Sequence, residues 1–124
     1  MTVGTWDPYR SDCPSRRLLD RIGDRWTVLI VGALDAGPRR FTELAAEVEG
    51  ISQKMLTQTL RSLERDGFVA RTAYPVVPPH VEYELTGLGR SLQHPLRALE
   101  SWAVENMDGV VQQQAAYDRR VSAA

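Results

Sequence analysis

The sequence of 124 residues contains one cysteine and two histidines, and the scarcity of each argues against particular functions. Its one cysteine, Cys13, excludes an intrachain disulfide, so a bridge could join only two molecules or the protein and a small thiol. The two histidines, His80 and His94, lie far from Cys13 and from each other, without the spacing of a metal site or of a nucleophile and its base. We therefore expect no enzyme, no metal site and no cofactor.

Long hydrophobic runs are also missing. No apolar stretch approaches the roughly 20 residues of a membrane-spanning helix, and the N-terminus lacks the hydrophobic core of a signal peptide. We expect a cytoplasmic protein that does not associate with membranes. With 43% hydrophobic and 25% charged residues, the chain suits one globular domain with a modest core.

The chain has no large excess of either charge. Its formal net charge of −1 argues weakly against nucleic acid as a partner, because non-specific binding to DNA depends on basic charge. Residues 52–80 differ from the whole, since their basic residues outnumber their acidic ones. The residues concerned are Lys54, Arg61, Arg65 and Arg71 against Glu64 and Asp66.

The most informative stretch is 52–67, which predicts one amphipathic helix. At 100° per residue, Leu56, Leu60 and Leu63 fall on one side of this helix. The opposite side gathers cationic, amide and hydroxyl groups without a carboxylate, a set that suits phosphate oxygens and base edges in a DNA major groove. The residues expected to face that groove are Ser52, Gln53, Lys54, Thr57, Gln58 and Arg61. The alternative is an ordinary solvated surface helix.

Secondary structure is predicted on both sides of this helix. The expected elements are helices at 12–23 and 24–36, a short strand at 39–41, helices at 42–50 and 52–67, strands at 68–74 and 81–85, and a helix from 86. Asp12 or Cys13 should cap the first helix, and Thr42 the third. In the second helix, a buried stripe is expected at Trp26, Leu29, Ile30, Ala33 and Leu34.

The helices at 42–50 and 52–67, joined by a turn containing glycine, predict a helix-turn-helix. The strands that follow form a hairpin around the stiff loop at 75–80, and this order is typical of a winged helix, with the hairpin as the wing. A plain hairpin with a proline-rich tip is the alternative. The fold class is thus mainly α with a small β-hairpin (α+β), in a dimeric winged helix-turn-helix.

The last helix carries more large apolar residues than a small core can bury. Pro95 should kink this helix or divide it into two. We assign part of its apolar stripe, together with the N-terminal helix, to a dimer interface, with packing inside one chain as the alternative. The expected interface residues are Leu18, Leu92, Leu96, Leu99 and Trp102. The single domain 1–124 then comprises an arm (1–11), N-terminal helices (12–36), the helix-turn-helix (42–67), the wing (68–85), dimerisation helices (86–111) and a tail (112–124), for which an extension of the last helix is the one structure left open.

The run from Gly50 to Arg90 resembles the HxlR-type winged-helix transcriptional regulators of bacteria, relatives of the MarR group. The strings ISQKMLT and VPPHVEY carry the resemblance, and Cys13-Pro14 and the runs 22–27 and 37–41 match as well. The resemblance implies a homodimer that places two recognition helices in successive major grooves of a pseudo-palindromic site, with the wings beside the minor groove. His80 stands where the family usually has a basic residue, so the wing could bind DNA more weakly or with a dependence on pH.

Within this surface, we expect Gln53, Gln58 and Arg61 to read base edges and Lys54 to contact phosphate. Arg40, Arg65 and Arg71 are expected to contact the DNA backbone or to form salt bridges. The wing residues expected at the DNA are Pro78, Pro79 and His80.

Cys13 is the candidate for regulation. The helix dipole and the neighbouring Arg16 and Arg17 can lower the pKa of its thiol, whereas Asp12 works against them. In the regulators that the chain resembles, the matching cysteine often senses oxidants or electrophiles; the alternative is a small, partly buried residue without reactivity. Two other functions stay open: a regulator controlled by a small hydrophobic effector at the dimer interface, and a winged-helix protein-interaction module that does not bind DNA.

Overall fold

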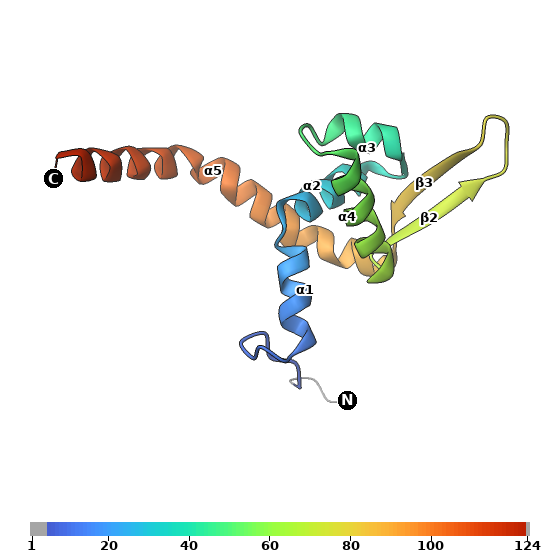
Figure 1. Ribbon diagram of the computed structural model, residues 1–124, viewed down its shortest axis with the longest axis horizontal. Helices are drawn as coiled ribbons and strands as arrows, with labels where there is room; N and C mark the ends of the chain where they lie inside the picture. The colour runs from blue at the N-terminus through green and yellow to red at the C-terminus, as the bar shows by residue number, and fades with distance from the viewer. Residues whose placement is uncertain (1–4, 124) are drawn as a thin grey trace.

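The computed structural model describes residues 5–123, which form a mainly helical protein with a three-stranded antiparallel sheet (Figure 1). The elements are α1 (Pro14–Ile22), α2 (Arg25–Ala33), the 3₁₀ turn η1 (Leu34–Ala36), β1 (Arg39–Arg40), α3 (Phe41–Glu47), α4 (Gln53–Arg65), β2 (Val69–Tyr74), β3 (His80–Leu85) and α5 (Gly87–Ala123). A helix-turn-helix followed by a hairpin confirms the predicted winged helix.

The first two helices begin at residues that the sequence marks as helix starts. Cys13 is the N-cap of α1, Pro14 occupies the first turn and Gly23 is the C-cap. The Asp24 carboxylate caps α2 by accepting a hydrogen bond from the N–H of Trp26 at 2.8 Å. The N-terminal helices therefore start close to the predicted residues, although only Asp24, and not Cys13, makes a side-chain capping hydrogen bond.

The predicted helix at 24–36 differs from the observed one in two respects. Its last residues form the 3₁₀ turn η1 rather than a continuation of α2. The predicted stripe was wrong at Leu29, which is 41% exposed, whereas Thr27 and Val31 are buried. Other helices contact α2 from several directions, so its buried face is not the single stripe that the apolar spacing suggests.

The turn between α3 and α4 depends on Gly50, whose φ of 91° is a conformation that other residues rarely adopt. The helix before it starts earlier than predicted. Arg40, not Thr42, is the N-cap of α3, because the Glu43 carboxylate reaches back and accepts a hydrogen bond from the Arg40 N–H at 2.9 Å. Thr42 consequently lies inside the first turn.

The core lies where α2, α3, α4, the sheet and the first turns of α5 meet. As predicted, Leu56, Leu60 and Leu63 of α4 are buried in it. The burial of these three leucines on one side directs the polar side of α4 outward.

The sheet has the order β1-β3-β2. Val69 pairs with Leu85, and both are buried, so their side of the sheet faces the helices. Residues directly opposite each other in an antiparallel pair share a face. The register therefore places Arg71, opposite Tyr83, on the helix-facing side, whereas Arg40, opposite Glu82, lies on the other side.

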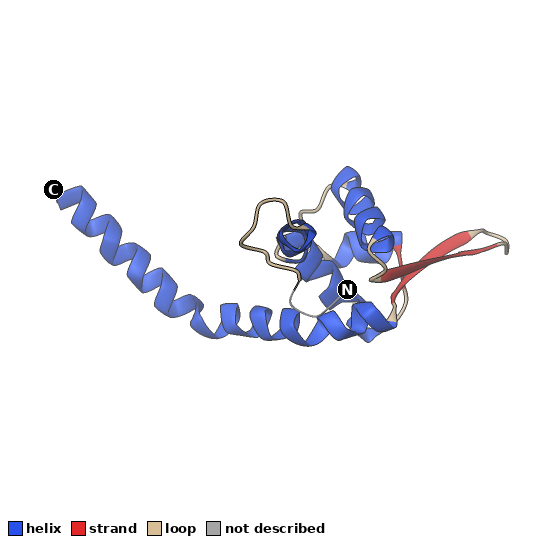
Figure 2. Cartoon of the chain, turned by 90° about the horizontal axis from the view of Figure 1, so that it is seen from below, coloured by secondary structure: helices blue, strands red, loops and turns tan. Residues whose placement is uncertain are grey.

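The last helix is longer than predicted. Pro95 does not divide α5, which runs unbroken through it for 37 residues, about 55 Å. Pro95 and Ser91 are exposed, so the Ser91 carbonyl that loses its N–H partner can be hydrated. Residues 112–123 continue the helix, the extension that the sequence left open, and α5 extends far from the rest of the chain (Figures 1 and 2).

Residues 1–4 of the expected arm, and Ala124, lie outside the described residues. Within 5–123, no helix is both long enough and apolar enough to cross a membrane.

Candidate nucleic-acid interface

The N-terminus of α4 is built to receive a negative charge. Ser52 is its N-cap, and the Ser52 Oγ accepts a hydrogen bond from the Met55 N–H at 3.0 Å. The first turn contains no acidic residue. The remaining free N–H groups and the positive end of the helix dipole therefore suit a phosphate.

The outward side of α4 carries the cations expected there. Lys54, Arg61 and Arg65 are exposed, and within residues 5–123 no ion pair engages any of the three. Arg65 thus has no salt bridge in the described part of the chain. Gln53 and Gln58 are exposed beside them.

Thr57 has a more limited role than the sequence suggests. Its Oγ1 donates a hydrogen bond to the carbonyl oxygen of Gln53 at 2.9 Å, within the helix. The side chain can then offer a base only its methyl group and the hydroxyl lone pairs.

At the C-terminal end of α4, the Asp66 carboxylate is paired with the guanidinium of Arg21 in α1. This ion pair ties α4 to α1 and neutralises an acidic group next to the cationic side. The sequence does not reveal the pair, because its two members are 45 residues apart.

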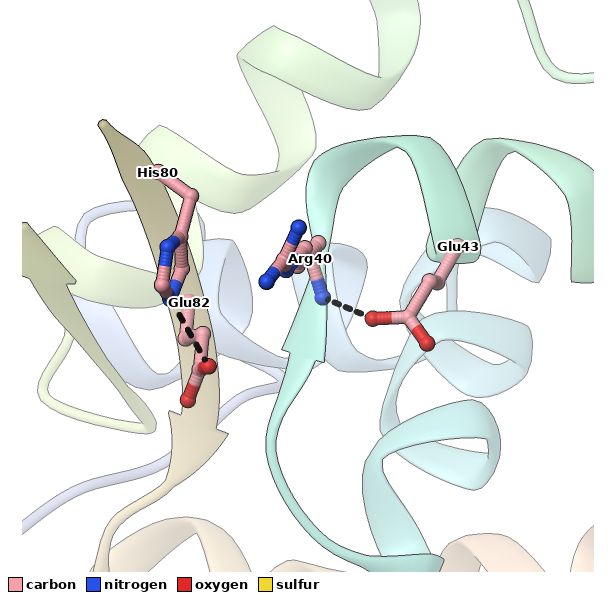
Figure 3. Close-up of polar contacts among 4 residues, drawn as sticks. All are labelled: Arg40, Glu43, His80 and Glu82. Atoms are coloured by element: carbon pink, nitrogen blue, oxygen red, sulfur yellow. Dashed lines mark hydrogen bonds and ion pairs between the residues drawn. The ribbon is translucent and has the colours of Figure 1, made fainter. Parts of the chain in front are cut away.

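The wing places His80 differently from the prediction. The predicted loop at 75–80 ends one residue earlier, and His80 is the first residue of β3. Its ring stacks on Tyr74, with the ring centroids 4.8 Å apart, and its Nε2 lies 3.2 Å from Glu82 Oε2 (Figure 3). Pro78 and Pro79 are exposed at the tip.

Glu82 is a member of this surface that the sequence reasoning missed. Figure 3 shows its carboxylate beside His80 on β3, on the sheet face that Arg40 shares. The alternation of side chains along a strand, which puts residues two apart on one face, could have placed it there. The wing thus combines a histidine with a carboxylate, and a neutral imidazole would leave that carboxylate uncompensated.

The chain holds Cys13 by two hydrogen bonds. Its Sγ accepts one from the Asp7 N–H at 3.1 Å and shares another with the Ser15 Oγ at 3.0 Å. These contacts connect the half-buried thiol to the segment before α1. The Arg16 guanidinium fastens the same segment by donating to the carbonyl oxygens of Pro8 and Tyr9, at 2.9 and 3.1 Å.

The hydrogen bond with the Ser15 side chain lowers the pKa of the Cys13 thiol, and the backbone N–H groups of Asp7 and Ser15 add to this effect. Partial burial and the Asp7 charge oppose it. The direction matches the prediction, but the causes are these hydrogen bonds and include no arginine; the Arg16 guanidinium donates instead to the Pro8 and Tyr9 carbonyls.

The residues expected at a dimer interface separate into two groups. Leu96 is only 7% exposed and belongs to the core of its own chain, so its assignment to the dimer surface was wrong; Leu92 packs against that core. Leu18, Leu99 and Trp102 are exposed. Leu92 and Leu96, in the first turns of α5, are thus covered by residues of the same chain. The spacing of apolar residues cannot distinguish such coverage from coverage by a partner.

Comparison with known proteins places these features in a family. A family model for the HxlR-like helix-turn-helix matches residues 21–111. The HTH-type transcriptional regulator YtfH of Escherichia coli K12 is 48% identical over 103 residues, which cover 83% of this chain and 82% of that protein.

Two solved structures have a similar fold. The structure of ytfH from Salmonella typhimurium has a TM-score of 0.84 and 44% identity, and the match covers 89% of this chain and 98% of that one. The redox regulator HypR in its oxidized form has a TM-score of 0.70 and 40% identity, with 76% and 97% covered. From its sequence and fold together, the chain belongs to the HxlR-like helix-turn-helix family of transcriptional regulators.

Proposed function

We propose that this protein binds a pseudo-palindromic DNA operator as a homodimer, with α4 of each protomer in a major groove and the wing beside the minor groove. The observation that carries the proposal is the outward side of α4. It is exposed and cationic, Lys54, Arg61 and Arg65 form no ion pair within residues 5–123, and the neighbouring Asp66 is neutralised by Arg21.

Individual residues receive different roles at the DNA. Gln53, Gln58 and Arg61 read base edges, whereas Lys54 and the N-terminus of α4 hold phosphates. Arg40 and Arg71 lie on opposite faces of the sheet, so a wing placed beside a groove can contact phosphates on both of its sides.

The homodimer is supported by α5. From Ser101 to Ala123 all side chains except Ala116 are exposed, including those of Trp102, Met107 and Tyr117. A protruding helix with so many solvated apolar groups gains stability only when another surface covers them. A second copy of α5 can do so by two-fold symmetry and thereby set the spacing of the two α4 helices.

The test is a fluorescence-anisotropy titration of the protein onto the DNA upstream of its own gene. Binding should weaken steeply with salt, because several phosphate contacts release counterions. Arg61→Ala should weaken specific binding by about 1–3 kcal/mol if Arg61 contacts a guanine bidentately. The matched control Arg119→Ala, at an exposed site near the end of α5, should bind like the wild type.

Binding that ignores both salt and Arg61→Ala would favour a protein-interaction module instead. Such an apolar partner interface would show little dependence on salt.

Control of this binding by Cys13 is a second element of the proposal. It is supported by the similarity to the redox regulator HypR and by the hydrogen bonds that lower the pKa of the thiol. An oxidant would take two hydrogens from two thiols to join Cys13 to its counterpart in the second protomer, or to a small thiol; an electrophile would alkylate it. Either product replaces the thiol or thiolate with a poorer hydrogen-bond acceptor, which weakens the bond from the Asp7 N–H and loosens one of the contacts that hold the segment before α1.

In the same titration, diamide should change the DNA affinity of the wild type and leave Cys13→Ser unchanged. An equal response of the two proteins would exclude Cys13 as the sensor while leaving the DNA-binding proposal intact.

A further inference from the structure

A cavity of about 590 Å³ lies between the segment before α1, α1 itself, the C-terminal end of α4 and the start of α5. Its size falls in the range of sites for small molecules. One wall is apolar and consists of Trp6, Leu18, Phe68 and Leu88.

The remainder of the lining includes three arginines together with Pro14, Ser15 and Asp66. Arg17, Arg21 and Arg65 border the cavity, with Asp66 as the only acidic residue among those that line it. Asp66 is paired with Arg21, whereas within residues 5–123 neither Arg17 nor Arg65 has a carboxylate partner. The cavity therefore combines an apolar wall with two uncompensated guanidinium groups.

We propose that this cavity binds a small amphipathic carboxylate, with its hydrocarbon body against the apolar wall and its carboxylate on Arg17 and Arg65. Guanidinium groups bind carboxylates through paired, charge-assisted hydrogen bonds. A neutral molecule would leave the two arginines uncompensated, and a small inorganic anion would leave the apolar wall in contact with water. Only a ligand with both parts matches the whole lining.

The position of the cavity links it to the recognition helix. Arg65 is the last residue of α4, and Asp66 is its C-cap and joins it to α1. A carboxylate on Arg65 removes a cation from the side of α4 proposed to face DNA, so the ligand should weaken DNA binding. That effect depends on the proposed function, whereas binding of the ligand does not.

The first experiment is isothermal titration calorimetry of the full chain with 2-naphthoate, and with naphthalene-2-methanol as the neutral analogue. Naphthoate should bind in a saturable manner and the alcohol more weakly. Arg17→Gln and Arg65→Gln should each reduce the affinity for naphthoate about tenfold. The control Arg119→Gln, far from the cavity along α5, should retain the wild-type affinity.

The second experiment adds naphthoate to the protein bound to its DNA. It should raise the dissociation constant of the wild type for DNA and have a much smaller effect on Arg17→Gln, a residue outside the proposed DNA contacts. Sedimentation in the same buffer should show an unchanged oligomeric state.

Equal affinities for the acid and the alcohol, unchanged affinity in both arginine variants, or no saturable heat would each overturn the cavity assignment. If naphthoate binds as described but no DNA does, the cavity assignment stands and the proposed function fails. If DNA binds and naphthoate does not, the reverse holds.

Discussion

Single hydrogen bonds determine what two candidate site residues can offer. Thr57 uses its hydroxyl proton inside α4, so it can contact a base only as an acceptor or through its methyl group. The pKa of the Cys13 thiol is lowered by the Ser15 side chain and by the backbone N–H groups of Asp7 and Ser15, with no arginine among the causes. Residue type alone indicates that these side chains are candidates, but their partners decide the chemistry.

A prediction at this scale concerns the pH dependence of Cys13. Because the thiolate is the reactive form and the pKa of the thiol is lowered, iodoacetamide should react half-maximally at a lower pH than with an ordinary cysteine. Ser15→Ala removes the largest cause of the lowering, so its profile should move to higher pH and its rate at neutral pH should fall. The rate is measured by mass spectrometry, with each protein unfolded in urea as its own reference. Identical profiles for the folded wild type and Ser15→Ala would remove Ser15 from this role.

Among the elements, the contact between α5 and the start of the wing depends on Gly89. A Cβ at this position would lie 2.0 Å from the Phe68 carbonyl oxygen and 3.2 Å from Leu85 Cδ2. Backbone therefore approaches backbone here, and α5 packs against the core only because position 89 has no side chain. Thr86 holds the same junction, since its Oγ1 accepts a hydrogen bond from the Gly89 N–H at 3.1 Å.

Gly89→Ala should consequently destabilise the protein by about 1–3 kcal/mol, the usual cost of overpacking a core. The matched control is Gly109→Ala, in the same helix, where nothing lies within 4 Å of an added Cβ. That change should stabilise the helix by about 0.5–1 kcal/mol, because alanine loses less conformational freedom than glycine. Urea unfolding at one protein concentration measures both, and equal stabilities of the two variants would contradict the close approach.

At the scale of the whole molecule, the most informative feature is the C-terminal part of α5, which protrudes from the rest of the protein (Figure 1). Leu96 marks where the core ends, and beyond it Leu99, Ala103 and Met107 continue the apolar stripe along the exposed helix. The same stripe thus serves the core of one chain at its start and is available to a partner at its end.

In the proposed homodimer, Met107→Glu should cause dissociation, because it places a carboxylate in each copy of the stripe that the partner would cover. The dimer dissociation constant should rise by at least about a hundredfold, since an unpaired buried charge costs several kcal/mol. Gln112→Glu introduces the same charge about 140° further round the helix and should leave the dimer intact. Sedimentation velocity over a range of concentrations measures both; a Met107→Glu protein that remains dimeric would place the interface elsewhere.

The sequence by itself determined the order of elements and the polarity of α4. Capping residues and the period of the apolar residues are local signals, so the start of α1 at Cys13 and the leucines of α4 could be interpreted without a structure. The fold class followed from the order of the elements, and the family from strings that lie close together in the chain.

Only the tertiary structure decided which apolar and charged groups meet across long stretches of chain. The burial of Leu96, the pairing of Arg21 with Asp66 and the opposite faces of Arg40 and Arg71 depend on packing and strand register. The cavity beside Arg65 likewise combines residues from four separate segments. The period of the apolar residues shows which side of a helix is apolar. It does not show whether the same chain or a second molecule covers that side, because the hydrophobic effect depends only on the apolar area removed from water.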